Sequence, residues 1–569
     1  MYFITFCKTM EQVQSTSKKK EKIRIFANFL KKLSSEELQY VCYYSAGRPF
    51  SINSELKIQF GWSSLMSVIN SLTNKSKSDL QAKYKEFADL GSLVEFALTT
   101  KKKTTKKLDS YFSSKQNQKK KLLSINKLNS FFIEIASFTG KGSIKEKKNK
   151  LYTLLQDVSP IEGKYIARII TSDTRTGFRE GLLVDTISFA FDRDGKDVRY
   201  AYMILSDIGE VAKLAKEETD LLSIKPILFN PLKSMLATKT ESAEDALETY
   251  KELITEYKMD GFRAQLHIST EHCKIYSRNL EDVTLAFPEI INSLSSETRK
   301  SLAPCILDGE IVALVGGKPV FFQDLLTRIL RKKEVEDSSS RLPTYYYVFD
   351  ILLLKDESLI NVPLIERKER ISNISHLIET AHTRIMPYKS LRSKDDIQEL
   401  KEKAIDDGSE GLMLKDPQSI YLAGKRGKGW LKLKVTLPTL DLVIIAAEWG
   451  HGRRTGWLSN YHLAAKADNR YAIIGKTFKG LTDREFTELT QKLQELKISE
   501  ERFIRVEPKI IVEVEFDNIQ ESNRYTSGLA LRFARIKRIR YDKTVEDVDT
   551  IETVKELYQS QLERQKRAR

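Results

Sequence analysis

Apolar residues recur at intervals of three and four along the first 235 residues, which is the spacing of amphipathic helices. Clear examples are "EKIRIFANFLKKL" at 21–33 and "SINKLNSFFIEIASF" at 124–138. A low-complexity basic stretch, "TTKKKTTKKLDSYFSSKQNQKKK" at 99–121, interrupts these helices and is predicted to be a loop. The pattern predicts an all-α N-terminal domain.

The pattern changes twice further along the chain. From about 240 to 436, short strands alternate with helices, which predicts an α/β (α+β) domain. From 437 onward, short apolar strands surround one charged helix at 483–497, which predicts a small β-barrel. We therefore expect three domains, at 1–238, 239–436 and 437–569.

Composition adds a charge bias to this picture. The 569 residues include 94 Lys and Arg against 78 Asp and Glu, a net charge of +16. Such an excess favours a polyanionic partner such as nucleic acid, although a generic basic surface would give the same count. The four cysteines are scattered, the six histidines lack metal-ligand spacing, and no signal peptide or membrane-length apolar run occurs. We expect a soluble, intracellular protein, in the cytoplasm or nucleoid.

One strand-like segment is interrupted by charge. In "EYKMDGFR" at 256–263, Lys258 is followed by Asp260, Gly261 and Arg263. A lysine amine attacks phosphorus only when neutral, although its ordinary pKa is about 10.4, so burial or neighbouring charge must favour the neutral form. A surface salt bridge is the alternative interpretation of this short string.

Further fragments supply complementary chemistry downstream. "ILDGEIVAL" at 306–314 places Asp308 and Glu310 in an apolar strand, where unpaired carboxylates would be unfavourable. The remaining fragments supply an aromatic ring, another carboxylate and paired lysines: "YYYVFDILLL" at 345–354 contains Phe349 and Asp350, "SEGLMLKD" contains Glu410, and "GKGWLKLK" contains Lys432 and Lys434. Together these residues fit nucleotidyl transfer, in which carboxylates hold a metal and lysines neutralise phosphates.

In order and spacing, these fragments resemble the motifs of ATP-dependent DNA ligases of the three-domain type found in archaea and in eukaryotic replication. "LRFARIKRIRYDK" at 531–543 is similar to that family's last motif, and "YIARIITSDTRTGFREGLLVDTI" at 165–187 to its DNA-binding signature. "KSMLA" at 233–237 is similar to the segment that enters the catalytic core. The resemblance implies a helical DNA-binding domain, a nucleotidyltransferase domain and a C-terminal OB-fold.

The resemblance also implies roles for individual residues. Lys258 would take AMP, Glu256 would read the adenine amino group, and Phe349 would stack on the ring. The other implied residues are Arg263, Arg278 and Glu310 for ribose and phosphate, Arg426, Lys432 and Lys434 for phosphate, Glu310 and Glu410 for Mg²⁺, and Arg532, Arg535 and Arg538 on one barrel strand that closes over the site.

The family's activity follows as an expectation. The enzyme would use ATP and Mg²⁺ to seal 5′-phosphate/3′-hydroxyl nicks in duplex DNA through a lysine–AMP intermediate, in replication, repair and recombination, as a monomer. Two positions depart from the family pattern: Ala534 replaces a common proline and Thr176 a common aliphatic residue. Because Lys425 and Arg426 are adjacent, either could contact phosphate.

Two further segments are candidates for partner binding. Arg175 and Arg179 flank Gly177 at a predicted turn before a helix, where two guanidiniums and backbone amides suit DNA phosphates; surface arginines at a capping turn are the alternative. Within the basic loop, "TKKLDSYF" at 105–112 resembles a sliding-clamp-binding motif. Leu108, Tyr111 and Phe112 would form its apolar plug unless they pack onto the helical domain.

Two other functions remain open at this stage. An RNA ligase or an mRNA capping enzyme would share the core motifs but generally lacks the helical domain with "RTGFREG". A catalytically silent DNA-binding scaffold would not need Lys258, Glu310 and Glu410, which are all present.

Overall fold

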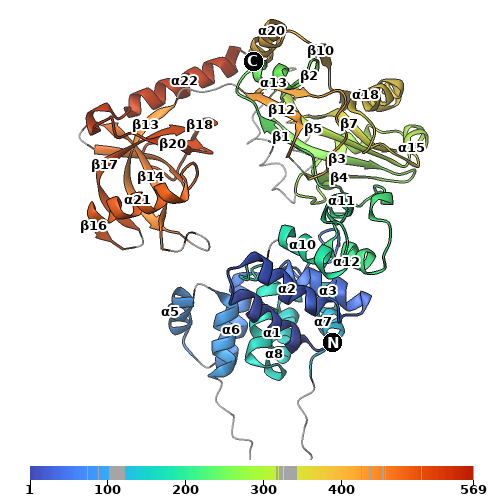
Figure 1. Cartoon of the computed structure of the whole chain (residues 1–569), viewed down its shortest axis with the longest axis vertical. Helices are drawn as coiled ribbons and strands as arrows, with labels where there is room; N and C mark the ends of the chain where they lie inside the picture. The colour runs from blue at the N-terminus through green and yellow to red at the C-terminus, as the bar shows by residue number, and fades with distance from the viewer. Residues whose placement is uncertain are drawn as a thin grey trace, which may run out of the picture.

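The computed structural model describes residues 1–73, 75–87, 89–100, 122–178, 180–315, 318–319, 325, 342–424, 426–434, 439–450, 454, 456–468, 470–501 and 503–567. Three parts follow one another along the chain (Figure 1): a helical part, a part with two sheets, and a strand-rich part that ends in a long helix. The predicted order of all-α, α/β and β-rich regions is therefore confirmed.

The N-terminal part is built from helices around one apolar core. Pattern and capping agree: Ser34 and Glu37 form a reciprocal capping box at the start of the third helix. The two helices predicted at 21–33 and 124–138 correspond to α2 and α7. The helices are α1 (Phe3–Gln14), α2 (Lys19–Leu30), α3 (Ser35–Ser45), α4 (Trp62–Thr73), α5 (Lys77–Phe87), α6 (Leu90–Thr99), α7 (Ile125–Ser137), α8 (Ser143–Asp157), α9 (Pro160–Ile170), α10 (Glu180–Ala190), α11 (Gly195–Leu205), α12 (Ile208–Lys216) and the short 3₁₀ helix η2 (Leu221–Ser223).

The central part contains two sheets. The first has the order β1 (Leu236–Lys239), β12 (Arg426–Lys434), β11 (Gly411–Lys415), β2 (Leu253–Tyr257) and β10 (Tyr388–Leu391). The second has the order β4 (Cys273–Ser277), β3 (Phe262–Ile268), β5 (Cys305–Val315), β7 (Thr344–Leu354) and β8 (Glu357–Ser358), with β6 (Lys318–Pro319) beside β5 and β9 (Thr383–Ile385) beside β7. The helices are α13 (Ala243–Thr249), η3 (Thr284–Ala286), α14 (Pro288–Asn292), α15 (Ser296–Leu302), α18 (Leu364–Asn373), α19 (Ser375–Ile378) and α20 (Lys394–Asp406).

The connection between these two sheets positions the candidate nucleophile. β2 belongs to the first sheet and β3 to the second, and the four residues between them include Lys258. Side chains from both sheets share one core cluster, in which Phe349 comes from β7 and Trp430 from β12. The candidate lysine therefore lies where the chain passes from one sheet to the other, next to their shared core.

The C-terminal part contains a six-stranded sheet and a two-stranded sheet over one core. Its elements are β13 (Leu440–Trp449), β14 (Leu458–Ala467), β15 (Arg470–Thr477), α21 (Asp483–Glu495), β16 (Lys497–Glu500), β17 (Ile504–Glu515), β18 (Asn518–Glu521), β19 (Leu529–Arg532), β20 (Arg535–Ile539), η5 (Val545–Asp547) and α22 (Ile551–Arg567). The predicted charged helix is α21. The pattern analysis missed α22, which extends from this part to α20 of the central part (Figure 1).

One prediction about this part is wrong. Arg532, Arg535 and Arg538 do not share a strand: Arg532 ends β19, whereas the other two lie on β20. The chain turns between the two strands at Phe533, whose φ of 55° is incompatible with continued extended structure. The last motif is therefore divided between two strands.

Candidate active site

The backbone of Lys258 is fixed to the start of β11, which Glu410 directly precedes. The Lys258 N–H donates to the Gly411 carbonyl at 2.9 Å, and the Glu410 N–H donates to the Lys258 carbonyl at 2.8 Å. A side chain at Gly261 would not fit, because its Cβ would lie 2.6 Å from the Ile311 carbonyl oxygen of β5. The loop that holds Lys258 is thus pinned to both sheets.

The side chain of Lys258 forms a short ion pair with Glu410, whose carboxylate also lies 3.2 Å from Lys434 Nζ. The Lys258 side chain retains 22% of its exposure, so the ammonium is accessible to a ligand. Glu410 therefore lies between the candidate nucleophile and a lysine expected to contact phosphate.

Three carboxyl groups influence one another beside this lysine. Burial raises the pKa of Glu310 to about 7, and Glu410 adds to the shift. Burial and the charge of Glu410 likewise raise the pKa of Asp260. Glu410 itself is held ionised, because Lys258 and Lys434 lower its pKa against the opposing effect of burial. Lys258, Lys434, Arg263 and Arg532 each act on at least one of these carboxyl groups, so the net charge beside Lys258 depends on the protonation of Glu310 and Asp260.

The described residues fit a metal that the substrate helps to hold. No group of three or more His, Cys, Asp or Glu side chains among them could hold an ion unaided. Mg²⁺ is commonly bound by one or two carboxylates together with substrate phosphates. Glu310 and Glu410 match that donor set.

Aromatic and charged side chains cluster beside Met259, the residue that follows Lys258, and we call this cluster of Phe349, Trp430, Lys415 and Glu256 the aromatic pocket. The Phe349 ring meets Trp430 edge to face, with centroids 5.9 Å apart. Lys415 Nζ lies 4.5 Å from the Phe349 centroid and 4.4 Å from the Trp430 centroid. Among the described residues, the buried Trp430 Nε1–H makes no hydrogen bond, whereas the Lys415 ammonium is paired with a carboxylate. One unused donor therefore borders the rings.

Glu256 is the acceptor in the same pocket. It is 2% exposed and forms ion pairs with two buried lysines, Lys368 and Lys415, the second at 2.5 Å. Burial lowers the pKa of Lys415 to about 8. The carboxylate expected to read adenine is thus held by two cations that the sequence analysis did not single out.

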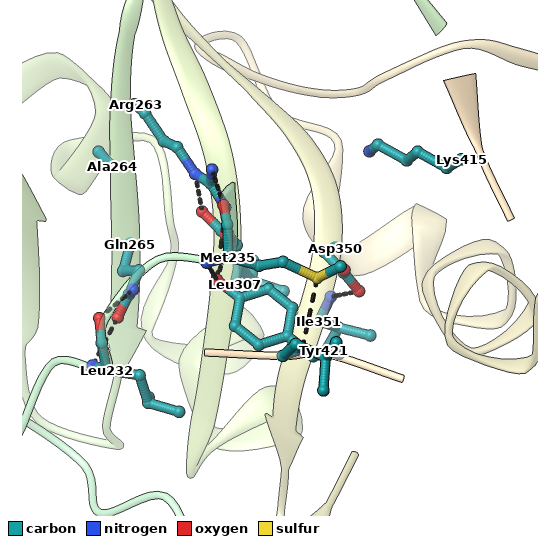
Figure 2. Close-up of polar contacts among 12 residues, drawn as sticks. Leu232, Met235, Arg263, Ala264, Gln265, Leu307, Asp350, Ile351, Lys415 and Tyr421 are labelled. Carbon is teal, nitrogen blue, oxygen red and sulfur yellow. Dashed lines mark hydrogen bonds and ion pairs between the residues drawn. The ribbon is translucent and has the colours of Figure 1, made fainter. Parts of the chain in front are cut away.

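Arg263 is committed to a buried network (Figure 2). Its guanidinium pairs with Asp308, with Nη2 to Oδ2 at 2.7 Å and Nε to Oδ1 at 3.2 Å. Tyr421 donates to the same Asp308 carboxylate at 2.6 Å. The guanidinium also lies 5.3 Å from the Phe349 centroid. Arg263 therefore adjoins the aromatic pocket, and its orientation is fixed by a buried carboxylate.

The other residues predicted to contact the nucleotide lie at or after the ends of strands or along β12. Arg278 is exposed in the turn after β4, and Lys432 lies partly buried on β12, on alternate positions with Lys434 as predicted. Arg426 is the first residue of β12, whereas Lys425 lies outside the described residues. The choice between these two adjacent residues for phosphate contact stays a prediction.

The C-terminal part contacts this site through acidic residues. Asp517 Oδ2 lies 3.1 Å from Lys434 Nζ, and Glu515 Oε1 lies 2.8 Å from Lys239 Nζ. Arg532 also lies near enough to Asp260 to favour its ionised form. Arg538 instead pairs with Glu513 within its own sheet at 2.6 Å. Two neighbouring acidic residues thus join the C-terminal part to the catalytic sheet.

The predicted DNA-binding turn lies directly before α10. Gly177 has a φ of 68°, and Lys22 donates to the Thr176 carbonyl at 2.8 Å. Arg175 pairs with Asp173 at 2.9 Å. Arg179, like Leu108, Tyr111 and Phe112 of the basic loop, lies outside the described residues.

Sequence reasoning missed Lys368, Lys415, Tyr421 and Asp517. Lys415 offered a signal, because it is a charge at the end of the apolar run "GLMLK", as Asp308 is within its own strand. Lys368 offered none, because it is one of five charged residues in "LIERKERISN", and this pattern usually indicates a solvated helix.

A half-buried lysine between two sheets, carboxylates beside it and an adjoining aromatic pocket are the features of a nucleotidyltransferase. Comparison with known proteins defines the family. The chain matches three domain models: DNA ligase N terminus over 2–188, ATP dependent DNA ligase domain over 234–434, and ATP dependent DNA ligase C terminal region over 454–543.

Similar proteins extend over nearly the whole chain. A DNA ligase of Archaeoglobus fulgidus is 36% identical over 568 residues, 99% of this chain and 98% of that one. A DNA ligase of Thermococcus fumicolans is 37% identical over 96% of both chains. The solved structure named Pmar-Lig_PreS3 is 18% identical, with a TM-score of 0.55 over 94% of this chain and 99% of that one, which shows a shared fold.

The chain belongs to the ATP-dependent DNA ligase family. The family uses ATP and a divalent metal, typically Mg²⁺, and acts on nicked DNA. In the described part of the chain, no helix is long and apolar enough to span a membrane.

Proposed function

We propose that Lys258 accepts AMP from ATP and that the enzyme uses this adduct to seal nicks in duplex DNA. One observation carries the proposal: the Lys258 ammonium contacts Glu410 at the junction of the two sheets, beside the pocket of Phe349, Trp430 and Glu256. A nucleotide whose base enters that pocket would present its phosphates toward Lys258 and Lys434.

The reaction consists of three in-line transfers. Neutral Lys258 Nζ attacks the α-phosphorus of ATP, and the bond to pyrophosphate breaks. The AMP then moves to the 5′ phosphate of the nick, which gives that phosphate a good leaving group. Finally the 3′ hydroxyl attacks the phosphate, and AMP departs as the phosphodiester forms.

The pocket residues would orient the nucleotide. Glu256 would accept from the adenine amino group, Lys415 would hold that carboxylate in place, and Phe349 would offer a stacking face. The further proposed contacts are those to ribose and phosphate by Arg263, Arg278, Glu310, Arg426, Lys432 and Lys434. Mg²⁺, held by Glu310 and Glu410, would neutralise phosphate charge.

The flanking parts would hold the DNA. We assign 1–238 to DNA binding, 239–436 to adenylation and 437–569 to an OB-fold, although β1 already joins the catalytic sheet at Leu236. Arg175, Gly177 and Arg179 would contact phosphates, and Arg532, Arg535 and Arg538 would act from the C-terminal part. The enzyme would work as a monomer inside the cell, with residues 105–112 docking on a sliding clamp.

Sealing assays with matched substrates test the proposal. The wild-type enzyme with ATP and Mg²⁺ should join nicked duplex DNA. Lys258→Ala should not, because it lacks the amine, and Lys258→Arg should not, because its guanidinium stays protonated. Both variants should still bind nicked DNA. Preferential sealing of nicked RNA would instead indicate an RNA ligase, and sealing by either variant would show that Lys258 is not the nucleophile.

A further inference from the structure

The segment that joins the helical part to the catalytic part lies along β3 and is held there by side chains (Figure 2). Arg263, Gln265 and His267 occupy alternate positions of β3 and therefore share one face of the strand. Each contacts the backbone of the segment at 229–235. β3 is paired with β4 and β5 along its two edges, so these side chains bind the linker across the face of the sheet.

The contacts are spaced three residues apart along the linker. His267 Nδ1 accepts from the Phe229 N–H at 3.0 Å. Gln265 binds both backbone groups of Leu232: its Oε1 accepts from the N–H at 3.0 Å, and its Nε2 donates to the carbonyl at 2.8 Å. His267, Gln265 and Leu232 are essentially fully buried. Because unpaired buried amide groups are unfavourable, these contacts fix the position of the linker.

Met235 brings the linker into the Arg263 network. Its carbonyl accepts from Arg263 Nη1 at 2.6 Å, and its N–H donates to the Tyr421 hydroxyl at 3.1 Å. The same hydroxyl donates to Asp308, which holds the other side of the guanidinium. Tyr421 is 3% exposed. One hydroxyl therefore joins the linker backbone to the carboxylate that orients Arg263.

The helical part holds the same linker from its other side. The Lys233 N–H donates to the Met203 carbonyl of α11 at 3.0 Å, and Lys233 Nζ lies 2.7 Å from Glu180, the first residue of α10. Linker residues 232 and 235 thus face the catalytic part, while residue 233 contacts the helical part.

We propose that Tyr421 is a positioning residue of the adenylation reaction, which acts through Asp308 and the Met235 backbone to fix the guanidinium of Arg263. The linker at 229–235 is then part of the structure that fixes the nucleotide site. The proposal rests on the proposed contact between Arg263 and the nucleotide, and it assigns Tyr421 no contact with ATP.

The test is single-turnover self-adenylation of the full chain at varied ATP concentration. Tyr421→Phe keeps the ring but removes the hydroxyl, so Asp308 loses a donor, and the Met235 N–H and Arg263 Nη2 each lose an acceptor. We expect the ATP concentration for half-maximal rate to rise about tenfold, the loss of one hydrogen bond to a charged group. The maximal rate should stay within about twofold, because Lys258 and its carboxylates are untouched.

Tyr346→Phe is the matched control. The Tyr346 hydroxyl is equally buried and donates to the Ala264 and Leu307 carbonyls, but it makes no hydrogen bond with the side chain of Arg263 or Asp308. Tyr346→Phe should lower the melting temperature about as much as Tyr421→Phe does. It should leave the ATP concentration for half-maximal rate unchanged.

Arg263→Ala separates the two proposals. If Arg263→Ala raises the ATP concentration for half-maximal rate and Tyr421→Phe does not, the positioning role of Tyr421 is refuted while the proposed function stands. If Arg263→Ala leaves ATP use unchanged, the assumed nucleotide contact is wrong. An equal rise in Tyr346→Phe would show that any lost buried hydroxyl has this effect, which also refutes the positioning role.

Discussion

Glu256 is the carboxylate whose removal should most disturb the catalytic part. It is 2% exposed and is the shared partner of Lys368 and Lys415, each with a side chain 1% exposed. The change Glu256→Gln keeps the size of the side chain but removes its charge. Two buried ammonium groups then face a neutral amide, and neither can reach solvent without movement of the surrounding strands.

The expected loss of stability follows from the buried ion pairs that Glu256→Gln would remove. Removing one partner of a buried ion pair typically destabilises a protein by about 3–5 kcal/mol. For a domain of this size, about 1 kcal/mol shifts the melting temperature by roughly 2–4 °C, so the catalytic part should melt roughly 6–20 °C lower. Lys415→Met leaves Glu256 paired with Lys368, and we expect less than half that loss.

Differential scanning calorimetry of the full chain can resolve the affected transition. We predict a large decrease in the melting temperature of the catalytic part for Glu256→Gln and a smaller decrease for Lys415→Met. If the two variants melt together, or Glu256→Gln melts with the wild type, then the carboxylate does not neutralise both lysines. Adding ATP should stabilise Lys415→Met less than wild type, because that variant loses one of the two cations that hold Glu256 in place.

The pH dependence of Lys415 gives an independent check on this pocket. Burial lowers its pKa to about 8, below the value in the unfolded chain. Between about pH 8 and 10.5, the unfolded chain therefore binds more protons, and this lysine makes stability rise with pH. The wild type should gain stability relative to Lys415→Met from pH 7 to 10. A constant difference in unfolding free energy would contradict the shift.

Three further predictions concern other parts of the chain. Replacing Arg175 and Arg179 with Ala should weaken binding to nicked DNA and flatten its salt dependence, with adenylation unaffected; an unchanged salt slope would exclude these phosphate contacts. Changing Tyr111 and Phe112 to Ala should leave sealing by the isolated enzyme intact but abolish stimulation by the cognate sliding clamp, and persistent stimulation would exclude the loop as the docking plug. Because burial raises the pKa of Glu310 to about 7, its carboxylate forms only as pH rises through that value. At subsaturating Mg²⁺, single-turnover adenylation should therefore increase across pH 6–8, and a flat profile would argue against a role for this carboxylate.

Much of the fold was predictable because its patterns are local. The helical spacing of the N-terminal part and the continuous apolar run at 345–354 each indicate one element, and the structure contains α2, α7 and β7 there. Lys258 was detectable because charged residues that interrupt an apolar strand-like segment are unfavourable unless they are paired or functional. The turn at Phe533 was not detectable, since a bulky residue rarely adopts positive φ and nothing in "LRFARIK" indicates a break.

The partners of the buried charges depend on tertiary contacts that no local pattern encodes. Asp350 and Asp308 look alike in sequence, each a carboxylate inside an apolar strand. In the structure, Asp350 pairs with Arg367 of α18 at 2.7 Å, whereas Asp308 orients Arg263 beside the nucleotide pocket. The sheet register sets Asp308 and Asp350 opposite each other, so their surroundings differ through the arginine that each one meets, from β3 for Asp308 and from α18 for Asp350.

The location of the covalent AMP tests the central claim most directly. The full-length enzyme would be incubated with α-labelled ATP and Mg²⁺ without DNA, digested with protease, and analysed by mass spectrometry. We predict one adenylated peptide, with AMP on the side chain of Lys258, and loss of the label in acid as expected for a phosphoramide. AMP on another residue, or no covalent AMP in an enzyme that seals nicks with ATP, would contradict the proposed mechanism.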